Sequence, residues 1–449
     1  MTQTLKQRAI HAGSWVLSGH AASQLIRLGG NLILTRLLVP EMFGLMAVVS
    51  VILNGLAMFS DLGVTQNIIQ SKRSDERDYI NTAWSVQILR GSVMFLLMLI
   101  LSISFYYVGG SGLFAEGSVY SDTELPFILA AMSLTGLISG FNSINLALLN
   151  RDLKLKKIMT IEVLSQVMGL LVMIALAWYQ RDIWSLVVGT VFSAFCKMLL
   201  SHHRSLGDKS CWGWDKEALY EIFHFGKWVF GASIFTFLMG QGDRLLLGGL
   251  VSPKELGVYT IAFFLAMAFK EIVRKVMSSV LYPVLSEVVR SRPQDLKKVY
   301  YKMRRHLDAV VMIVVGILAS TGHVVIDFLY DDRYQNAGWM LEILSLSTIF
   351  LGITMAGVCF MALGNSKYIM LLTGVSAIFL FISVPLAYGI YGLYGAVVVI
   401  ALNSIVEVPL IFYKMHQYKL LCLKSEFKFF PLFFISYYMG DSVVNYLGL

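Results

Sequence analysis

Long apolar segments constrain this chain more than any other feature. A helix needs roughly 20 apolar residues to cross the hydrocarbon core of a bilayer. About a dozen segments of the 449-residue chain approach or exceed that length. Inside lipid each segment must satisfy its own backbone polar groups, so an all-α polytopic membrane protein is expected. The expected spans are 13–38, 42–69, 82–108, 125–149, 158–179, 183–202, 222–250, 255–285, 307–329, 338–363, 367–387 and 391–413, with a weaker thirteenth at 427–448.

Basic residues in the connecting loops test this assignment. One set of alternate loops holds 24 Lys and Arg residues, and the opposite set holds only Arg181, Lys254 and Arg333. Cytoplasmic loops are enriched in Lys and Arg, so the N-terminus is expected in the cytoplasm. The net charge of +8 then reflects topology, and nucleic acid is not an expected partner. The first segment is too long for a signal-peptide core and should remain a membrane helix.

An internal repeat predicts the architecture. Residues 13–44 and 226–257 align without a gap at an offset of 213, with ten of 32 positions identical, including a Trp, a Pro and three Gly. Both copies start on the cytoplasmic side, so the repeats are parallel, an arrangement found in transporters. We expect two pseudo-symmetric six-helix bundles around a central cavity. The predicted domains are an N-terminal lobe at 1–205, a cytoplasmic linker at 206–221, a C-terminal lobe at 222–415 and a final segment at 416–449.

Nine basic residues fall within the expected spans. A charge at the bilayer centre costs roughly 2.5–3.5 kcal/mol on insertion scales, so deep charges need a reason. Arg36, Lys197 and Lys227 lie near span ends and can reach the interface. The deeper cations indicate an anionic substrate, because the Arg fork matches phosphate and carboxylate groups. The candidate substrate-binding residues are Arg27, Arg90, Arg244, Lys270 and Arg274.

Fewer acids lie inside the spans. The clearest are candidates for ion coupling or charge pairing: Asp61, Asp243, Glu271 and Glu407. An excess of cations over acids favours a cationic cavity. The alternative that stays open is that these charges form interhelical ion pairs.

Motifs of enzyme chemistry are not found. The chain has no phosphate-binding loop, no HExxH and no GxSxG, so no catalytic residue is proposed and the protein is not expected to be an enzyme. The four cysteines lack metal-ligand spacing, which predicts neither a disulfide nor a metal site. The sequence GLISG at 136–140 fits a motif for close helix packing.

Two stretches carry a family resemblance. LTRLLVPEMFGLMAVVSVILNGLAMFSDLGVTQNIIQ (34–70) and DRLLLGGLVSPKELGVYTIAFFLAM (243–267), followed by LYPVLSEV (281–288), resemble the bacterial polysaccharide transporter family. These are the Wzx-type oligosaccharide flippases of the multidrug/oligosaccharidyl-lipid/polysaccharide (MOP) flippase superfamily. The similarity covers about residues 5–415.

The resemblance implies a function. Such a flippase would move an oligosaccharide repeat unit linked to polyprenyl (undecaprenyl) pyrophosphate to the outer leaflet of the bacterial inner membrane by alternating access. It implies no ATP hydrolysis, no bound cofactor, and coupling to a proton or sodium gradient or to membrane potential. A polysaccharide polymerase and glycosyltransferases are the implied partners. The family's charged residues match by helix and depth at Arg27, Asp61, Asp243 and Arg244, and more loosely at Arg90, Lys270 and Arg274.

Three rival functions stay open at this point, one of which, a purely structural membrane scaffold, leaves the buried charges and the duplicated bundle unexplained. A cation-coupled multidrug exporter of the MATE type would have the same architecture, but acidic residues should dominate its cavity. A membrane-embedded glycosyltransferase or polymerase would normally carry a sizeable catalytic loop, and no loop here is long enough.

Overall fold

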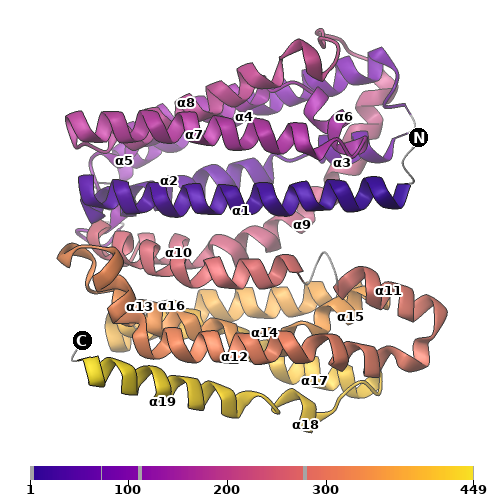
Figure 1. The fold of residues 1–449 in the computed structure, drawn as a ribbon. Coiled ribbons are helices and arrows are strands. Elements are labelled where there is room, and N and C mark those ends of the chain that lie inside the picture. The colour runs from indigo at the N-terminus through magenta and orange to yellow at the C-terminus, as the bar shows by residue number, and fades with distance from the viewer. Residues whose placement is uncertain (1–4, 72, 110–113, 277–280, 448–449) are drawn as a thin grey trace. The chain divides into compact units, whose positions relative to one another are not determined.

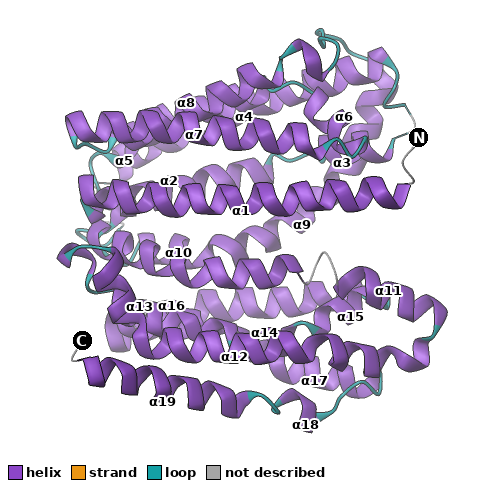
Figure 2. Cartoon of the chain, in the orientation of Figure 1, coloured by secondary structure: helices purple, strands orange, loops and turns teal. Residues whose placement is uncertain are grey.

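The computed structural model describes residues 5–71, 73–109, 114–276 and 281–447, and these residues form helices joined by short loops, without a strand (Figure 2). The helices follow the apolar segments of the sequence. Water is missing from the bilayer core, and a helix is the structure in which a single segment satisfies its own backbone groups. The predicted all-α membrane fold is confirmed.

The chain divides into two compact units within a single helix, between Phe237 and Leu238. In the first unit α1 packs on α7, α7 on α8, and α4 on α5, as Figure 1 shows. Its helices are α1 (Leu5–Leu37), α2 (Pro40–Phe59), α3 (Val64–Gln70), α4 (Arg77–Val108), η1 (Val119–Ser121), α5 (Leu125–Gly140), α6 (Asn145–Arg151), α7 (Leu155–Gln180), α8 (Trp184–Ser201), η2 (Arg204–Leu206) and the start of α9 (Lys216–Gly248).

In the second unit α12 packs on α13 and α19, and α13 packs on α10 and α16. Buried side chains of α11, α12, α14, α15 and α17 form its largest apolar core. Its further elements are α10 (Pro253–Val276), α11 (Tyr282–Ser291), η4 (Pro293–Asp295), α12 (Leu296–Leu329), η5 (Asp332–Tyr334), α13 (Ala337–Ser345), η6 (Leu346–Thr348), α14 (Leu351–Thr354), α15 (Ala356–Ala362), α16 (Ser366–Leu402), η7 (Asn403–Val406), α17 (Glu407–Gln417), α18 (Leu423–Glu426) and α19 (Phe430–Leu447).

The sequence repeat corresponds to a repeat of elements. Helices α1 and α9 both have 33 residues, and each is followed by a helix that starts at a proline, Pro40 or Pro253. Proline suits the first turn of a helix, where its missing N–H costs nothing. In the second copy Ser252 and Glu255 form a reciprocal cap, with the Ser252 Oγ 2.9 Å from the Glu255 carboxylate.

The number of spans depends on how broken helices are counted. Among the described residues, eight helices are long and apolar enough to cross a membrane, or nine if the bent pair α5–α6 is one span. Helices α1, α9 and α19 are not among them, and residues 367–417 count once. Those 51 residues would extend about 75 Å, more than twice the roughly 30 Å hydrocarbon core. They contain a break at Gly392, whose φ of 62° is not helical, close to the boundary expected between spans at 387–391.

The boundary between the units lies later than the expected linker at 206–221. Ala218 and Ile222, in the first two turns of α9, are fully buried in an apolar cluster with residues of α3, α4 and α6. Residues 211–215, here called the strap, are also bound to α4. The Cys211, Gly213 and Asp215 N–H groups donate to side chains of α4 at 2.8–3.0 Å. The strap and the start of α9 therefore belong to the first unit.

Candidate functional site

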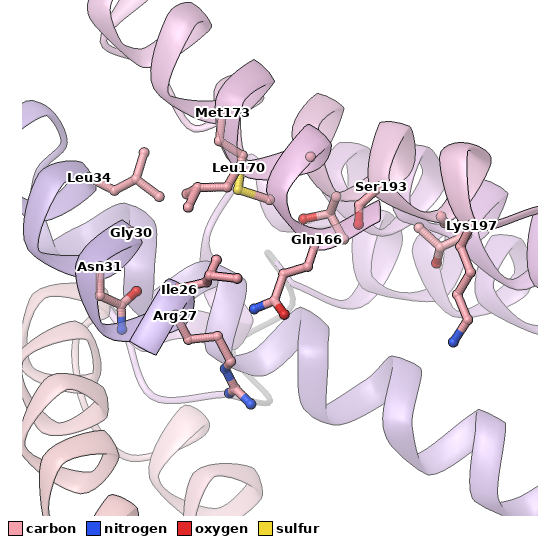
Figure 3. A pocket seen from close by; sticks show the side chains of 14 residues that line it. Ile26, Arg27, Gly30, Asn31, Leu34, Gln166, Leu170, Met173, Ser193 and Lys197 are labelled. Atoms are coloured by element: carbon pink, nitrogen blue, oxygen red, sulfur yellow. The ribbon is translucent and has the colours of Figure 1, made fainter. Parts of the chain in front are cut away.

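Arg27 lines a cavity of about 440 Å³ inside the first unit. The cavity lies among α1, α5, α7 and α8, and Figure 3 shows Arg27 and Gln166 extending to the same side of it. Gln166 is held in place from α1, because the Ser23 Oγ donates to its Oε1 at 2.5 Å. Polar groups accompany the guanidinium on an otherwise apolar wall; they are Asn31, Thr135, Gln166, Thr190, Ser193 and Lys197.

Lys197 connects this cavity with a second one. It lines the Arg27 cavity and also a cavity of about 280 Å³ that includes Arg90. Its Nζ lies 3.4 Å from the Glu162 carboxylate on α7. From the sequence Lys197 is expected to reach the interface, yet it lines both cavities. Its place inside a continuous apolar run of α8 is the signal that argued for an inward position. The first unit thus brings Arg27, Arg90 and Lys197 to adjoining cavities.

Arg90 stabilises a break in a membrane span. The apolar stretch expected as one helix at 42–69 is interrupted between Phe59 and Val64. The Arg90 guanidinium donates to the Ala57 carbonyl in the last turn of α2 at 2.6 Å and to the Ser60 Oγ at 3.2 Å. It also pairs with Asp61 at 3.3 Å. A cation at a helix C-terminus is favourable, because the unpaired carbonyls carry partial negative charge.

Asp61 shapes the same break. Its carboxylate accepts a hydrogen bond from the Gly63 N–H at 3.0 Å, and Gly63 adopts a φ of 62°, which glycine reaches without strain. The two deep charges of this pair are thus each satisfied by the other and by freed backbone groups.

Asp243 and Arg244 face different partners, as expected for adjacent helical positions. The Tyr259 hydroxyl of α10 donates to the Asp243 carboxylate at 2.6 Å, and both side chains are buried. The Arg244 guanidinium lies 4.4 Å from the centre of the Phe263 ring and 3.3 Å from the Gln241 Oε1. The Nε of Arg244 is buried and has no hydrogen-bond partner among the described residues. This arginine therefore retains a donor for a ligand.

The predicted charges of α10 differ in their surroundings. Lys270 donates from Nζ to the Ser347 carbonyl of η6 at 3.4 Å. Arg274, one turn later, is exposed and pairs with Glu271 at 3.6 Å. Glu407 starts α17 and accepts a hydrogen bond from the buried Ser376 hydroxyl at 2.5 Å.

One buried ionic cluster escaped the sequence analysis. Arg304 was counted among the loop cations, yet it is 1% exposed. Its guanidinium pairs with Asp308 and with Glu426, each at 2.7 Å. The hydroxyls of Tyr300 and Tyr301 complete the cluster, which joins α12 to α18. The i,i+4 spacing of Arg304 and Asp308 on one helix face was the available signal.

Ion pairs also hold the strap on the first unit. Arg73 pairs with Asp215 at 2.7 Å and with Glu76 at 2.8 Å. Its hydrogen bond holds the pKa of Asp215 below the ordinary value, helped by the backbone N–H groups of α9. Arg151 lowers the pKa of Asp75 in the same way.

The GLISG motif packs as its spacing predicts. A Cβ on Gly91 of α4 would lie 2.7 Å from the Gly140 Cα of α5. Only glycine permits this approach, so α4 and α5 contact each other through their backbones. The contact lies on the wall of the Arg90 cavity, which both glycines line.

Comparison with known proteins gives the family. The family model described as "Polysaccharide biosynthesis protein" matches residues 33–338. The chain belongs to this family. The predicted resemblance to a family of bacterial polysaccharide biosynthesis is thereby confirmed.

Two curated relatives of the family illustrate the similarity. The succinoglycan biosynthesis transport protein ExoT of Rhizobium meliloti (strain 1021) is 22% identical over 320 residues, covering 70% of this chain and 61% of the relative. The lipopolysaccharide biosynthesis protein WzxC of Escherichia coli (strain K12) is 22% identical over 318 residues, covering 70% and 60%. The chain thus spans about 60% of the length of these relatives.

Solved structures share the fold. The lipid II flippase MurJ in an inward-closed conformation matches with a TM-score of 0.73 at 14% identity, covering 96% of this chain and 93% of MurJ. A multidrug resistance MATE transporter of the MOP superfamily in an inward-facing conformation matches with a TM-score of 0.64 at 16% identity, covering 88% and 95%. At these identities the likeness establishes the architecture of a multi-pass membrane protein.

Proposed function

We propose that the protein is a flippase for polyprenyl (undecaprenyl) pyrophosphate-linked oligosaccharide repeat units. It carries them from the cytoplasmic to the outer leaflet of the bacterial inner membrane by alternating access, with its N-terminus in the cytoplasm. The exported units serve the synthesis of a surface polysaccharide such as O-antigen, capsule or exopolysaccharide. Membership of the polysaccharide biosynthesis family and a transport protein among the curated relatives support a transporter rather than an enzyme.

The observation that carries the proposal is Arg27 in its cavity. A diphosphate needs cationic donors in a polar recess inside the membrane, and Arg27 offers a guanidinium in a cavity of about 440 Å³ with Gln166 and Lys197. Lys270, Arg244 and Arg274 supply further cations in the second unit. Arg90 has a weaker claim, because the α2 terminus and Asp61 already occupy its donors.

A MATE-type drug exporter is the second candidate, favoured by the shared fold. An exporter of organic cations needs an acidic cavity, since like charges repel the ligand. The two cations that line the Arg27 cavity argue against that substrate class.

Flipping in proteoliposomes tests the proposal. Transbilayer movement of an undecaprenyl pyrophosphate-linked oligosaccharide should occur with the unaltered protein and fall at least tenfold in Arg27→Ala. Arg27→Lys should retain part of it. Lys254→Ala, an exposed lysine in the first turn of α10, is the matched control and should transport normally. Equal transport by Arg27→Ala would remove Arg27 from the site, and movement of organic cations alone would favour the exporter.

A further inference from the structure

Two breaks in helices of the second unit each carry a charge. The span expected at 338–363 is interrupted after α13 by the short 3₁₀ turn η6, and α16 is followed by η7 before α17 begins at Glu407. Interrupted helices free backbone carbonyls, and in transporters such breaks line substrate and ion sites. Short 3₁₀ turns within helices often mark functional hinges.

Lys270 and Glu407 lie at these two breaks. The Lys270 ammonium donates to a carbonyl of η6 at 3.4 Å, a long hydrogen bond. Glu407 has one short hydrogen bond, from Ser376 at 2.5 Å. Phe269 and Val408, the sequence neighbours of Lys270 and Glu407, pack against the same buried apolar cluster. Leu346 of η6 packs against this cluster as well, and α16 contacts both η6 and η7.

The two breaks hold more buried hydrogen-bonding atoms than the described residues satisfy. Within the described part of the chain, the Ser347 Oγ of η6 and the Asn403 Oδ1 of η7 are buried without a hydrogen-bond partner. A buried polar atom without a partner is costly, so such atoms indicate a group that is bound in another state.

Other charged groups near the pair are already engaged. Arg274 follows Lys270 by one turn and pairs with Glu271 at 3.6 Å. On the neighbouring α13, Glu342 is held by His323 at 2.7 Å. Glu407 is therefore the acid available to balance Lys270.

We propose that Lys270 exchanges Glu407 for the substrate diphosphate, and that Glu407 then takes up a proton. This inference rests on the proposed function. Before binding, the ammonium and the carboxylate balance each other. In the bound state the Lys270 ammonium donates to a diphosphate oxygen, and a proton from water converts the Glu407 carboxylate to the acid. No covalent bond to the substrate forms or breaks.

The physical reason is the cost of an isolated charge. A carboxylate in a low-dielectric site that loses its counter-ion becomes neutral rather than remaining charged. By linkage, proton uptake then strengthens binding of the anion as much as the anion strengthens proton uptake. The Lys270 ammonium would then balance one negative charge of the diphosphate, while the proton neutralises Glu407.

Calorimetry of farnesyl diphosphate binding, in two buffers of different ionisation enthalpy at pH 7, tests the exchange. The purified full chain should take up about one proton per bound diphosphate. Glu407→Gln should still bind, with proton uptake near zero. Glu287→Gln, which changes an exposed acid of α11, is the control and should keep normal uptake. Unchanged uptake in Glu407→Gln would overturn the exchange.

Variants of Lys270 separate the exchange from misfolding. Lys270→Met should weaken farnesyl diphosphate binding by about tenfold, the effect of roughly 1.4 kcal/mol. Lys270→Met/Glu407→Gln removes both charges and should melt at the temperature of the unaltered protein while binding weakly and without proton uptake. Tight binding by this pair would overturn the role of Lys270. If the unaltered protein binds no polyprenyl diphosphate, the proposed function itself fails.

Discussion

At the scale of single residues, the deep charges are satisfied in different ways. Arg90 serves the broken end of α2, Arg244 lies over an aromatic ring, and Arg304 is enclosed by two carboxylates. A buried charge that loses its partners costs far more than an exposed one, because the low dielectric leaves it uncompensated. Removal of the fully buried Arg304 should therefore lower the free energy of unfolding most.

Replacing Arg304 by Met should strongly destabilise the second unit. The change leaves Asp308 and Glu426 buried without a cation, and breaking such a cluster costs about 3–5 kcal/mol. Arg305→Met provides the control, because the adjacent Arg305 is exposed and should change stability little. Thermal unfolding in detergent measures both. Equal melting temperatures for the two variants would show that the cluster does not stabilise the fold.

At the scale of elements, breaks and close contacts determine where charges and cavities lie. The break between α2 and α3 positions Asp61, and the breaks at η6 and η7 position the partners of Lys270 and Glu407. The α4–α5 contact through Gly91 and Gly140 sets one wall of a cavity. Small residues and helix breaks thus position the cavities and the partners of the charged residues.

Adding one methyl group at Gly91 should separate α4 from α5. The Cβ of Gly91→Ala would meet backbone atoms of α5 at 2.7–3.0 Å, which cannot move like a flexible side chain. Overpacking of this kind costs about 1–3 kcal/mol. Gly389→Ala is the comparison, since nothing lies within 4 Å of its Cβ. The melting temperature should fall only in Gly91→Ala; a fall of the same size in both would contradict the contact.

The sequence predicts the helices better than it predicts which side chains contact one another. Hydropathy is a local property, so the apolar runs and the repeat that pairs α1 with α9 could be read directly. The break at Asp61 could not, because Ser60 and Asp61 interrupt the apolar stretch of 42–69 only briefly. Arg304 stands among polar neighbours, which indicated a loop, and its partner Glu426 lies more than a hundred residues away. Contacts at such separations have no signature in one sequence.

At the scale of the whole molecule, the attachment of the strap to α4 makes the strap and the start of α9 part of the first unit. Arg73 holds Asp215, and three N–H groups of the strap donate to α4. The pKa of Asp215 is lower in the folded protein than its ordinary value, which is about 3.9. Its stabilising contribution is therefore complete above that ordinary value and is lost as the pH falls through the lowered pKa.

Hydrogen exchange should report this attachment. At neutral pH the strap N–H groups should be protected, after correction for intrinsic rates, and they should lose protection only well below pH 4. In Asp215→Asn the strap N–H groups should exchange rapidly already at neutral pH. In Glu217→Gln the strap should stay protected, because Glu217 is exposed and its carboxylate lies farther from Arg73, at 3.6 Å. Protection that survives in Asp215→Asn would show that the α4 hydrogen bonds suffice.

The attachment of the strap bears on fragment complementation. A gene divided at the apparent linker would place the strap and the first turns of α9 on the wrong polypeptide, or sever them from α4. The N-terminal fragment would then expose the apolar surface that Ala218 and Ile222 normally cover. The boundary between the two units therefore lies inside α9, between Phe237 and Leu238. A protein divided at residues 206–221 would be divided within the first unit.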